Sequence, residues 1–217
     1  MGMKLSDFII KRSISFCRFI MNSLINDFLK FLNNNTPIPE SELQKLKNIS
    51  NIKKIKQGDY FLRQGDKSYE IAFICKGLFR ITYLTEDGKE FTKSFFDEQS
   101  FLVSYSALLE NRESYFSIEA LEDSTIVVVD YNEWKAFFEN EISWNKLLVV
   151  ILQKAFCNKE TREREFLIYD AKTRYLSFIQ TYPKLSKRLK QHVIASYLGI
   201  TPEALSTIKK RLKLNLD

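Results

Sequence analysis

The sequence predicts an α+β chain in which a β-rich jelly roll is followed by a long helix and then by a helical C-terminal region. Three observations predict this order. Turn signals recur between residues 52 and 130, a helical apolar spacing begins after Asp130, and a tight glycine turn joins two amphipathic segments near the C-terminus. A length of 217 residues with 45% hydrophobic content is sufficient for two domains with packed cores.

The first 20 residues are expected to be an N-terminal extension. Lys11, Arg12 and Arg18 interrupt their apolar clusters, so that no run could span a bilayer or act as a signal-peptide core. The sequence therefore predicts no membrane association and a cytoplasmic location. From residue 21 an amphipathic helix is expected to run to Leu32, and a second short helix is expected over Ser41–Asn48.

Residues 21–135 are expected to form one β-rich domain preceded by these helices. Short runs rich in Ile, Phe, Tyr, Val and Thr alternate with the turn sequences Gln-Gly-Asp (twice), Lys-Gly and Glu-Asp-Gly. Apolar and polar residues alternate in Leu78–Tyr83, whereas Ser124–Asp130 is apolar throughout its middle, which is typical of a buried strand. Turn signals about 8–12 residues apart favour a sandwich or barrel, and a compact jelly roll fits this length.

Residues 136–165 are expected to form a long helix that links this domain to the C-terminal region. One seam follows alternating steps of four and three residues along it: Trp144, Leu148, Ile151, Ala155 and Asn158. We expect the seam to pair with its copy in a second subunit and form a homodimer. Folding of the helix back onto its own β domain is the alternative. A further helix, Asp170–Tyr182, is expected to stop at Pro183.

The net charge of +6 is concentrated in the predicted C-terminal domain, residues 166–217. This range contains 10 Lys and Arg against 3 Asp and Glu, whereas residues 1–165 contain 23 against 24. Positive charge gathered in about fifty residues favours a polyanionic partner, because each neutralised phosphate releases counterions. A solvated basic helix face is the alternative.

The most informative stretch runs from Leu189 to Leu212. Gly199 is expected to take a positive φ and end a first helix, Thr201 to cap a second helix, and Pro202 to occupy its first turn. Apolar residues give each helix an inner face: Val193, Ile194, Ala195 and Leu198 in the first, and Leu205, Ile208 and Leu212 in the second. This arrangement is a helix-turn-helix, whose second helix can lie in the major groove of duplex DNA.

The outer face of the second helix supplies the candidate DNA-binding residues. Glu203 can accept a hydrogen bond from a cytosine amino group, Ala204 and Thr207 can contact thymine methyl groups, and the cations suit phosphates. The full set is Thr201, Glu203, Ala204, Ser206, Thr207, Lys209, Lys210, Arg211 and Lys213. An ordinary helical hairpin with a wet basic face is the alternative.

These features resemble the Crp/Fnr (catabolite-activator-like) transcription regulators. The turns named above, the long helix and the run ASYLGITPEALS from Ala195 to Ser206 carry the resemblance, which extends from about Asn22 to Leu212. It implies a double-stranded β-helix sensor similar to cyclic-nucleotide-binding domains, a coiled-coil dimer interface and a helix-turn-helix that reads palindromic DNA. RNA polymerase is a further candidate partner.

The sensor departs from the cyclic-nucleotide-binding members of that family. Where those members have a Gly-Glu pair for the ribose and an Arg-Ser pair for the phosphate, this sequence has Val103-Ser104 and Ser114-Tyr115. Without the arginine a buried cyclic phosphate would lack its partner, so we expect no binding of cyclic AMP. The candidate pocket residues for a different small-molecule effector are Ser104, Tyr105, Ser106, Ser114 and Tyr115. A cavity filled by neighbouring apolar side chains is the alternative.

The predicted helix-turn-helix also departs from the family pattern. Thr207 stands where the family often has Arg, so we expect a different site preference. We also expect the family's wing hairpin to be missing and phosphate contacts from that side to be fewer.

Metal-dependent and catalytic functions are poorly supported by the residue content. A single histidine, His192, and three scattered cysteines without a C-x-x-C motif disfavour metal sites, disulfide frameworks and hydrolytic triads. We therefore expect neither a cofactor nor enzyme activity. Two other functions remain as alternatives: a ligand-sensing module whose helical tail binds a protein, and a cupin-type enzyme, which would need several histidines on its strands.

Overall fold

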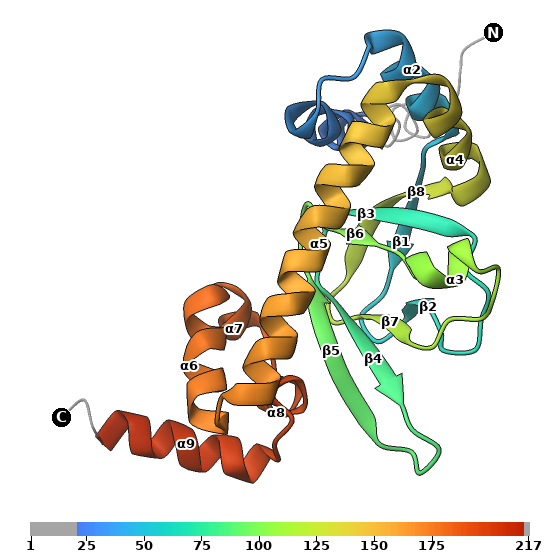
Figure 1. Ribbon diagram of the computed structural model, residues 1–217. Coiled ribbons are helices and arrows are strands. Elements are labelled where there is room, and N and C mark those ends of the chain that lie inside the picture. The colour runs from blue at the N-terminus through green and yellow to red at the C-terminus, as the bar shows by residue number, and fades with distance from the viewer. Residues whose placement is uncertain (1–20, 215–217) are drawn as a thin grey trace, which may run out of the picture. The chain divides into compact units, whose positions relative to one another are not determined.

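The computed structural model describes residues 21–214, with side chains as far as residue 212, and it divides into two compact units (Figure 1). Residues 21–79 and 95–149 form the first unit, and residues 80–94 and 150–214 form the second. This division falls inside the long helix and groups one hairpin with the C-terminal helices. The predicted N-terminal extension, residues 1–20, lies outside the described residues.

The eight described strands form two four-stranded sheets. The first has the order β1 (Asn51–Ile55), β8 (Ser124–Asp130), β3 (Glu70–Lys76) and β6 (Phe101–Leu102), and the second has the order β2 (Tyr60–Leu62), β7 (Ser117–Ala120), β4 (Phe79–Leu84) and β5 (Glu90–Phe96). The pairs β1–β8, β3–β8, β3–β6 and β2–β7 are antiparallel. The predicted β-rich domain of jelly-roll type is confirmed.

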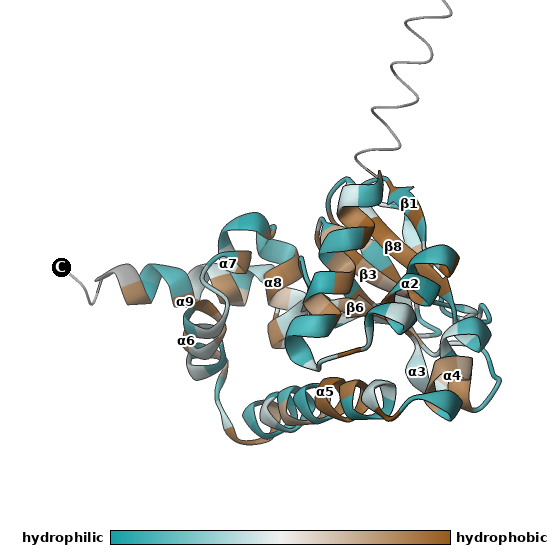
Figure 2. Ribbon diagram, turned by 90° about the horizontal axis from the view of Figure 1, so that it is seen from above, coloured by the Kyte–Doolittle hydropathy of each residue, from teal (hydrophilic) through white to brown (hydrophobic). Residues whose placement is uncertain are grey.

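The centre of the first sheet is almost wholly apolar (Figure 2). Ala72 pairs with Val128 and Ile74 pairs with Ile126, and all four side chains are at most 2% exposed. The four residues from Ile126 to Val129 are all buried. Because successive strand residues point to opposite faces, both faces of β8 are covered, which explains its uninterrupted apolar sequence.

Helices pack against this sheet through an aromatic cluster. The ring of Phe28, in the helical residues 21–35, lies 4.9 Å from that of Phe73 on β3. Trp134 of α4 (Tyr131–Asn140) lies 6.1 Å from Trp144 in α5 (Ile142–Ile168). Such tilted and edge-to-face pairs stabilise a core beyond the apolar area that they bury.

The first turns of α5 are held to α2 (Glu40–Ile49) by a buried hydrogen bond. Trp144 is 0% exposed, and its indole nitrogen donates to Glu42 Oε2 at 3.3 Å. A hydrogen bond from Lys45 to Glu42, together with that from Trp144, holds the pKa of the Glu42 carboxyl below its usual value, although burial opposes the shift. Trp144 therefore belongs to the core of its own subunit.

The second unit contains the end of α5 and four further helices, α6 (Ala171–Thr181), α7 (Leu185–Arg188), α8 (Gln191–Leu198) and α9 (Pro202–Leu214). Asp170 caps α6 by accepting from the Thr173 amide at 2.7 Å, and Pro183 follows shortly after its end. The core consists of Phe178, Leu185, Val193, Ile194, Ala195, Leu198 and Leu205, each at most 4% exposed. Within residues 21–214 no helix combines the length and the apolar character that crossing a bilayer requires.

Candidate nucleic-acid interface

The turn between α8 and α9 has the geometry that its sequence predicts. Gly199 adopts a left-handed conformation, φ 67° and ψ 35°, at the end of α8, and the Ile200 amide donates to the Ala195 carbonyl at 3.1 Å. Thr201 Oγ1 then accepts from the Ala204 amide at 3.2 Å, which caps α9, and Pro202 is its first residue. Local residue chemistry therefore ends α8 at Gly199 and begins α9 at Pro202.

This geometry leaves one edge of α9 open. Leu205 is fully buried, whereas Ile208 and Leu212 are half-buried. Among the candidate DNA-binding residues, Thr201, Glu203, Ala204, Thr207, Lys210 and Arg211 are exposed, and Ser206 and Lys209 are half-buried. Lys213 lies within α9, but its side chain is outside the described residues.

Glu203 is held as an ionised acceptor at the beginning of α9. Its own backbone amide, followed by the Thr201 hydroxyl, hydrogen-bonds the carboxylate and keeps the pKa of Glu203 below its usual value. The Thr207 hydroxyl donates to the Glu203 carbonyl at 3.0 Å, so its proton is used within the helix. Thr207 therefore offers its methyl group and a hydroxyl lone pair to a partner.

Two arginines that the sequence did not single out brace the turn. Arg162, near the end of α5, donates to the Tyr197 carbonyl, and its guanidinium lies 3.7 Å from the centre of the Tyr197 ring. Arg174 of α6 donates to the carbonyls of Leu198, at 3.2 Å, and Tyr169, at 2.7 Å. Both therefore satisfy carbonyls that the end of α8 leaves without helical partners.

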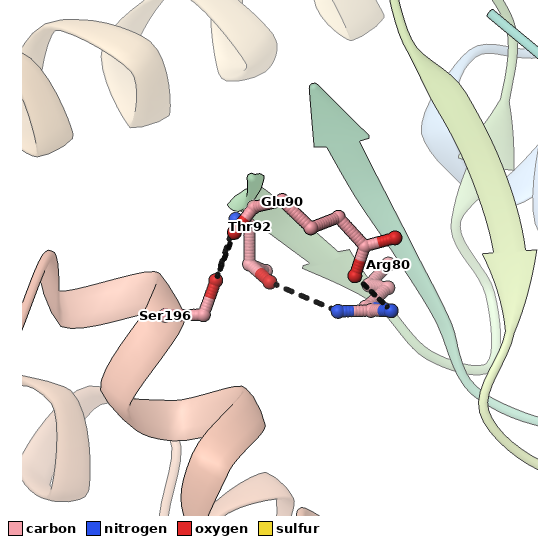
Figure 3. A network of polar contacts seen from close by, with 4 residues as sticks. All are labelled: Arg80, Glu90, Thr92 and Ser196. Atoms are coloured by element: carbon pink, nitrogen blue, oxygen red, sulfur yellow. Dashed lines mark hydrogen bonds and ion pairs between the residues drawn. The ribbon is translucent and has the colours of Figure 1, made fainter. Parts of the chain in front are cut away.

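A second contact that was not expected joins α8 to the β4–β5 hairpin (Figure 3). Ser196 Oγ accepts from the Thr92 amide at 2.9 Å and donates to the Glu90 carbonyl at 3.3 Å. Arg80 braces the hairpin beside this contact through Glu90, at 2.6 Å, and through the Thr92 hydroxyl, at 3.4 Å. The partners of Ser196 lie more than 100 positions away, so no local sequence signal could have revealed them.

The candidate effector residues gather around α3 (Tyr105–Leu109), but they do not share one environment. Ser104 and Ser114 are buried, and their hydroxyl oxygens lie 2.9 Å apart. Ser114 also donates to the Phe116 carbonyl at 2.8 Å. These two serines therefore satisfy each other inside the domain.

The other three effector candidates lie nearer the surface. Tyr105 is half-buried, Ser106 is exposed and Tyr115 is 66% exposed. Arg112 donates to Glu110 and to the Ser106 hydroxyl, and it lies 3.9 Å from the centre of the Tyr115 ring. The arginine nearest to these residues is thus already engaged.

The exposed apolar residues of α5 do not follow the predicted seam. Because Trp144 is buried in its own core, that position is not available to a second subunit, and the prediction is wrong there. Leu148 and Ile151 are half-buried, and Ala155 and Asn158 are exposed. The large exposed side chains in the middle of α5 include Val149 at 51%, Leu152 at 40% and Phe156 at 66%. We call Val149, Leu152 and Phe156 the α5 stripe; they lie on one face, at steps of three and four residues.

The described residues include no group of three or more His, Cys, Asp or Glu that could hold a metal ion. Burial raises the pKa of the Cys75 thiol to about 11, so this cysteine is protonated at neutral pH.

Comparison with known proteins finds one family model that matches the β-rich part of the chain. Residues 52–141 match the cyclic nucleotide-binding domain. The Anaerobic regulatory protein of Bacillus subtilis (strain 168) is 26% identical over 129 residues, which are 59% of this chain and 52% of that protein. The chain therefore spans about half the length of this curated relative.

Solved structures share the fold over most of the chain. CLP, a c-di-GMP-responsive global regulator of Xanthomonas campestris, has a TM-score of 0.68 at 14% identity, covering 82% of this chain and 93% of CLP. FixK2 of Bradyrhizobium japonicum has a TM-score of 0.69 at 14% identity, covering 77% and 86%. A transcriptional regulator of the crp/fnr family from Eubacterium rectale has a TM-score of 0.68 at 12% identity, covering 82% and 85%. Residues 52–141 therefore resemble the cyclic nucleotide-binding domain, and the chain shares the fold of solved regulators that include a member of the crp/fnr family.

Proposed function

We propose that this protein is a dimeric, sequence-specific DNA-binding regulator of transcription. The observation that carries the proposal is the open polar edge of α9, which follows a capped helix-turn-helix turn in the most basic part of the chain. The first turn of α9 enters the major groove. Two such reading helices, related by the symmetry of a homodimer, recognise a palindromic site.

The exposed residues of α9 divide into base readers and phosphate binders. Glu203, held ionised at the helix start, accepts from a cytosine amino group, and the methyl groups of Ala204 and Thr207 contact thymine. Lys210 and Arg211, further along the helix, bind phosphates. Specificity therefore depends on the first turns of α9 and affinity on the later ones.

The experiment that tests this function measures binding to two duplexes, a site selected from a random library and a scrambled version of it. We expect Glu203→Ala to change which sites are selected, and Lys210→Ala to weaken both duplexes by the same factor. Equal binding of every duplex, with no effect of Glu203→Ala, would count against specific recognition. A protein captured by the tail with no DNA binding at low salt would favour the protein-partner alternative.

The second copy packs against the α5 stripe. Val149, Leu152 and Phe156 expose three large apolar side chains along one helix face, which is unfavourable in water. We expect Phe156→Glu to produce a monomer in sedimentation velocity, whereas Lys154→Glu, an exposed change outside the stripe, leaves the dimer intact. If Phe156→Glu remains a dimer, the interface does not depend on the α5 stripe.

Cyclic AMP is not the effector of this regulator. Ser104 stands at a ribose-binding position of the cyclic-nucleotide-binding members and Ser114 at a phosphate-binding position, and here the two form a buried pair. Arg112 is engaged by Glu110 and stacked on Tyr115. We expect calorimetry to detect no heat of binding with cyclic AMP, and DNA affinity to be unchanged by it. Saturable binding would refute this. An effector of other chemistry, contact with RNA polymerase and a cytoplasmic location stay predictions.

A further inference from the structure

A short basic segment, which we call the α7 segment (residues 184–190), precedes the helix-turn-helix. It contains α7 and carries Lys184, Lys187, Arg188 and Lys190, four cations in seven residues. No Asp or Glu occurs between Ala171 and Pro202. The positive charge here therefore has no acidic neighbour in sequence to neutralise it.

The lysines of this segment also form no ion pair with the other described residues. Lys184, Lys187 and Lys190 are exposed, and no ion pair among the described residues involves them. Ion pairs are instead found among side chains between positions 42 and 123. These exposed ammonium groups repel one another only weakly through water, and a polyanion bound beside them would turn that repulsion into attraction.

A buried leucine anchors the helical turn that carries these cations. Leu185 is 4% exposed and anchors α7, and the Leu189 amide donates to the Leu185 carbonyl at 3.2 Å. Lys184 and Lys187 are spaced i and i+3, which places them on one side of this helical turn, and both are exposed. The segment is therefore a basic surface carried on an anchored backbone.

The position of the segment relates it to the reading helix. Lys190 is the N-cap residue of α8, and the next residue, Gln191, donates from Nε2 to the Pro202 carbonyl at 3.2 Å. The beginnings of α8 and α9 therefore lie side by side. In a helix-turn-helix the first helix crosses the sugar-phosphate backbone while the second lies in the major groove. Residues that lead into α8 are thus placed at the phosphates beside the groove that α9 enters.

We infer that the α7 segment is a second DNA-backbone site, in which Lys184, Lys187 and Lys190 bind phosphates flanking the bases read by α9. The inference rests on the proposed function, because it takes duplex DNA as the ligand of α9. It adds a contact that supplies affinity and register but no sequence preference, since phosphates are the same at every base pair. Figure 1 shows α7 joining α6 to α8.

The salt dependence of binding tests this site. Lys184→Gln, Lys187→Gln and Lys190→Gln are combined in one variant, and its control combines Lys30→Gln, Lys54→Gln and Lys135→Gln, which removes the same charge from exposed positions in the first unit. Affinity for the selected and scrambled duplexes is measured by fluorescence anisotropy between about 50 and 200 mM salt. Each phosphate contact contributes about 0.9 to the slope of log affinity against log salt.

The slope for the α7 variant should be smaller in magnitude by about 2.7 for each engaged subunit, because three phosphate contacts are lost. The affinity ratio of wild type to variant should therefore fall by about 40-fold per subunit between the lowest and the highest salt concentration. The ratio of affinities for the two duplexes should stay the same. Replacement of the same three lysines by Arg should restore the slope. A slope equal to that of the control variant, in a protein with wild-type circular dichroism, would overturn the inference. If the wild type does not bind duplex DNA at all, the proposed function fails instead.

Discussion

Replacing Gly199 with alanine should destabilise the second unit by about 3 kcal/mol. The φ of +67° is a left-handed conformation, which costs an L-residue about 1–2 kcal/mol. A Cβ at this position would lie 2.9 Å from two atoms of the Phe166 ring. The Phe166 ring is half-exposed and can rotate away from the new methyl group. It then loses its cation–π contacts with the guanidinium groups of Arg162 and Arg174, which lie 5.4 Å and 4.9 Å from the ring centre. Each lost cation–π contact costs about 0.5–1 kcal/mol.

A matched control separates these two costs. Gly88, in the hairpin of the same unit, has a φ of +80° with nothing within 4 Å of the place that a Cβ would occupy, so Gly88→Ala carries the conformational cost alone. Urea unfolding followed by circular dichroism should show Gly199→Ala to be less stable than Gly88→Ala by about 1–2 kcal/mol. In a Phe166→Ala background the two alanine substitutions should cost the same. Equal costs in the wild-type background would refute the argument from the ring.

Three further predictions concern single side chains. Ser196→Ala removes the acceptor of the Thr92 amide, so it should cost about 1–3 kcal/mol and speed hydrogen exchange at that amide; unchanged exchange would show that the hairpin contact is not maintained in solution. In Arg174→Lys a single ammonium group replaces the planar guanidinium that donates to the carbonyls of Leu198 and Tyr169, so the turn before α9 loses support. DNA binding should weaken while the selected sites stay the same; full affinity would argue that Arg174 does not brace the turn. The pKa of Glu42 is lowered in the folded protein, so the stability it contributes is complete above its unfolded pKa and is lost as pH falls through its folded pKa. The free energy of unfolding, measured by tryptophan fluorescence, should therefore fall with pH in this range, and Glu42→Gln should flatten the profile; an equally steep profile in the variant would assign the pH dependence to other carboxyls.

Local chemistry made the helix-turn-helix predictable from the sequence. Gly199, Thr201 and Pro202 each restrict the backbone or cap a helix within a few residues, so that the turn between α8 and α9 follows from them alone. The β-rich domain was predictable for a similar reason, because its turns and the apolar run of β8 are short-range signals. Both features depend on residues that are neighbours in the chain.

Features that depend on distant partners were not predictable. A helical apolar spacing shows that one face of α5 is apolar, but not whether that face meets its own domain or another subunit, and Trp144 turned inward. Ser196 and Arg162 are ordinary polar residues in the sequence, and only the folded chain brings them to Thr92 and to the Tyr197 carbonyl. For such contacts sequence spacing carries no information.

The placement of the two tryptophans gives the protein a selective optical probe. Trp134 and Trp144 are the only tryptophans in the sequence, and both are buried in the first unit, 6.1 Å apart. Intrinsic emission excited at the red edge of the absorption band therefore reports on the packing of the α5 start and is silent about α9. A change in that emission when a duplex binds would be a label-free record that binding alters the packing of the first unit.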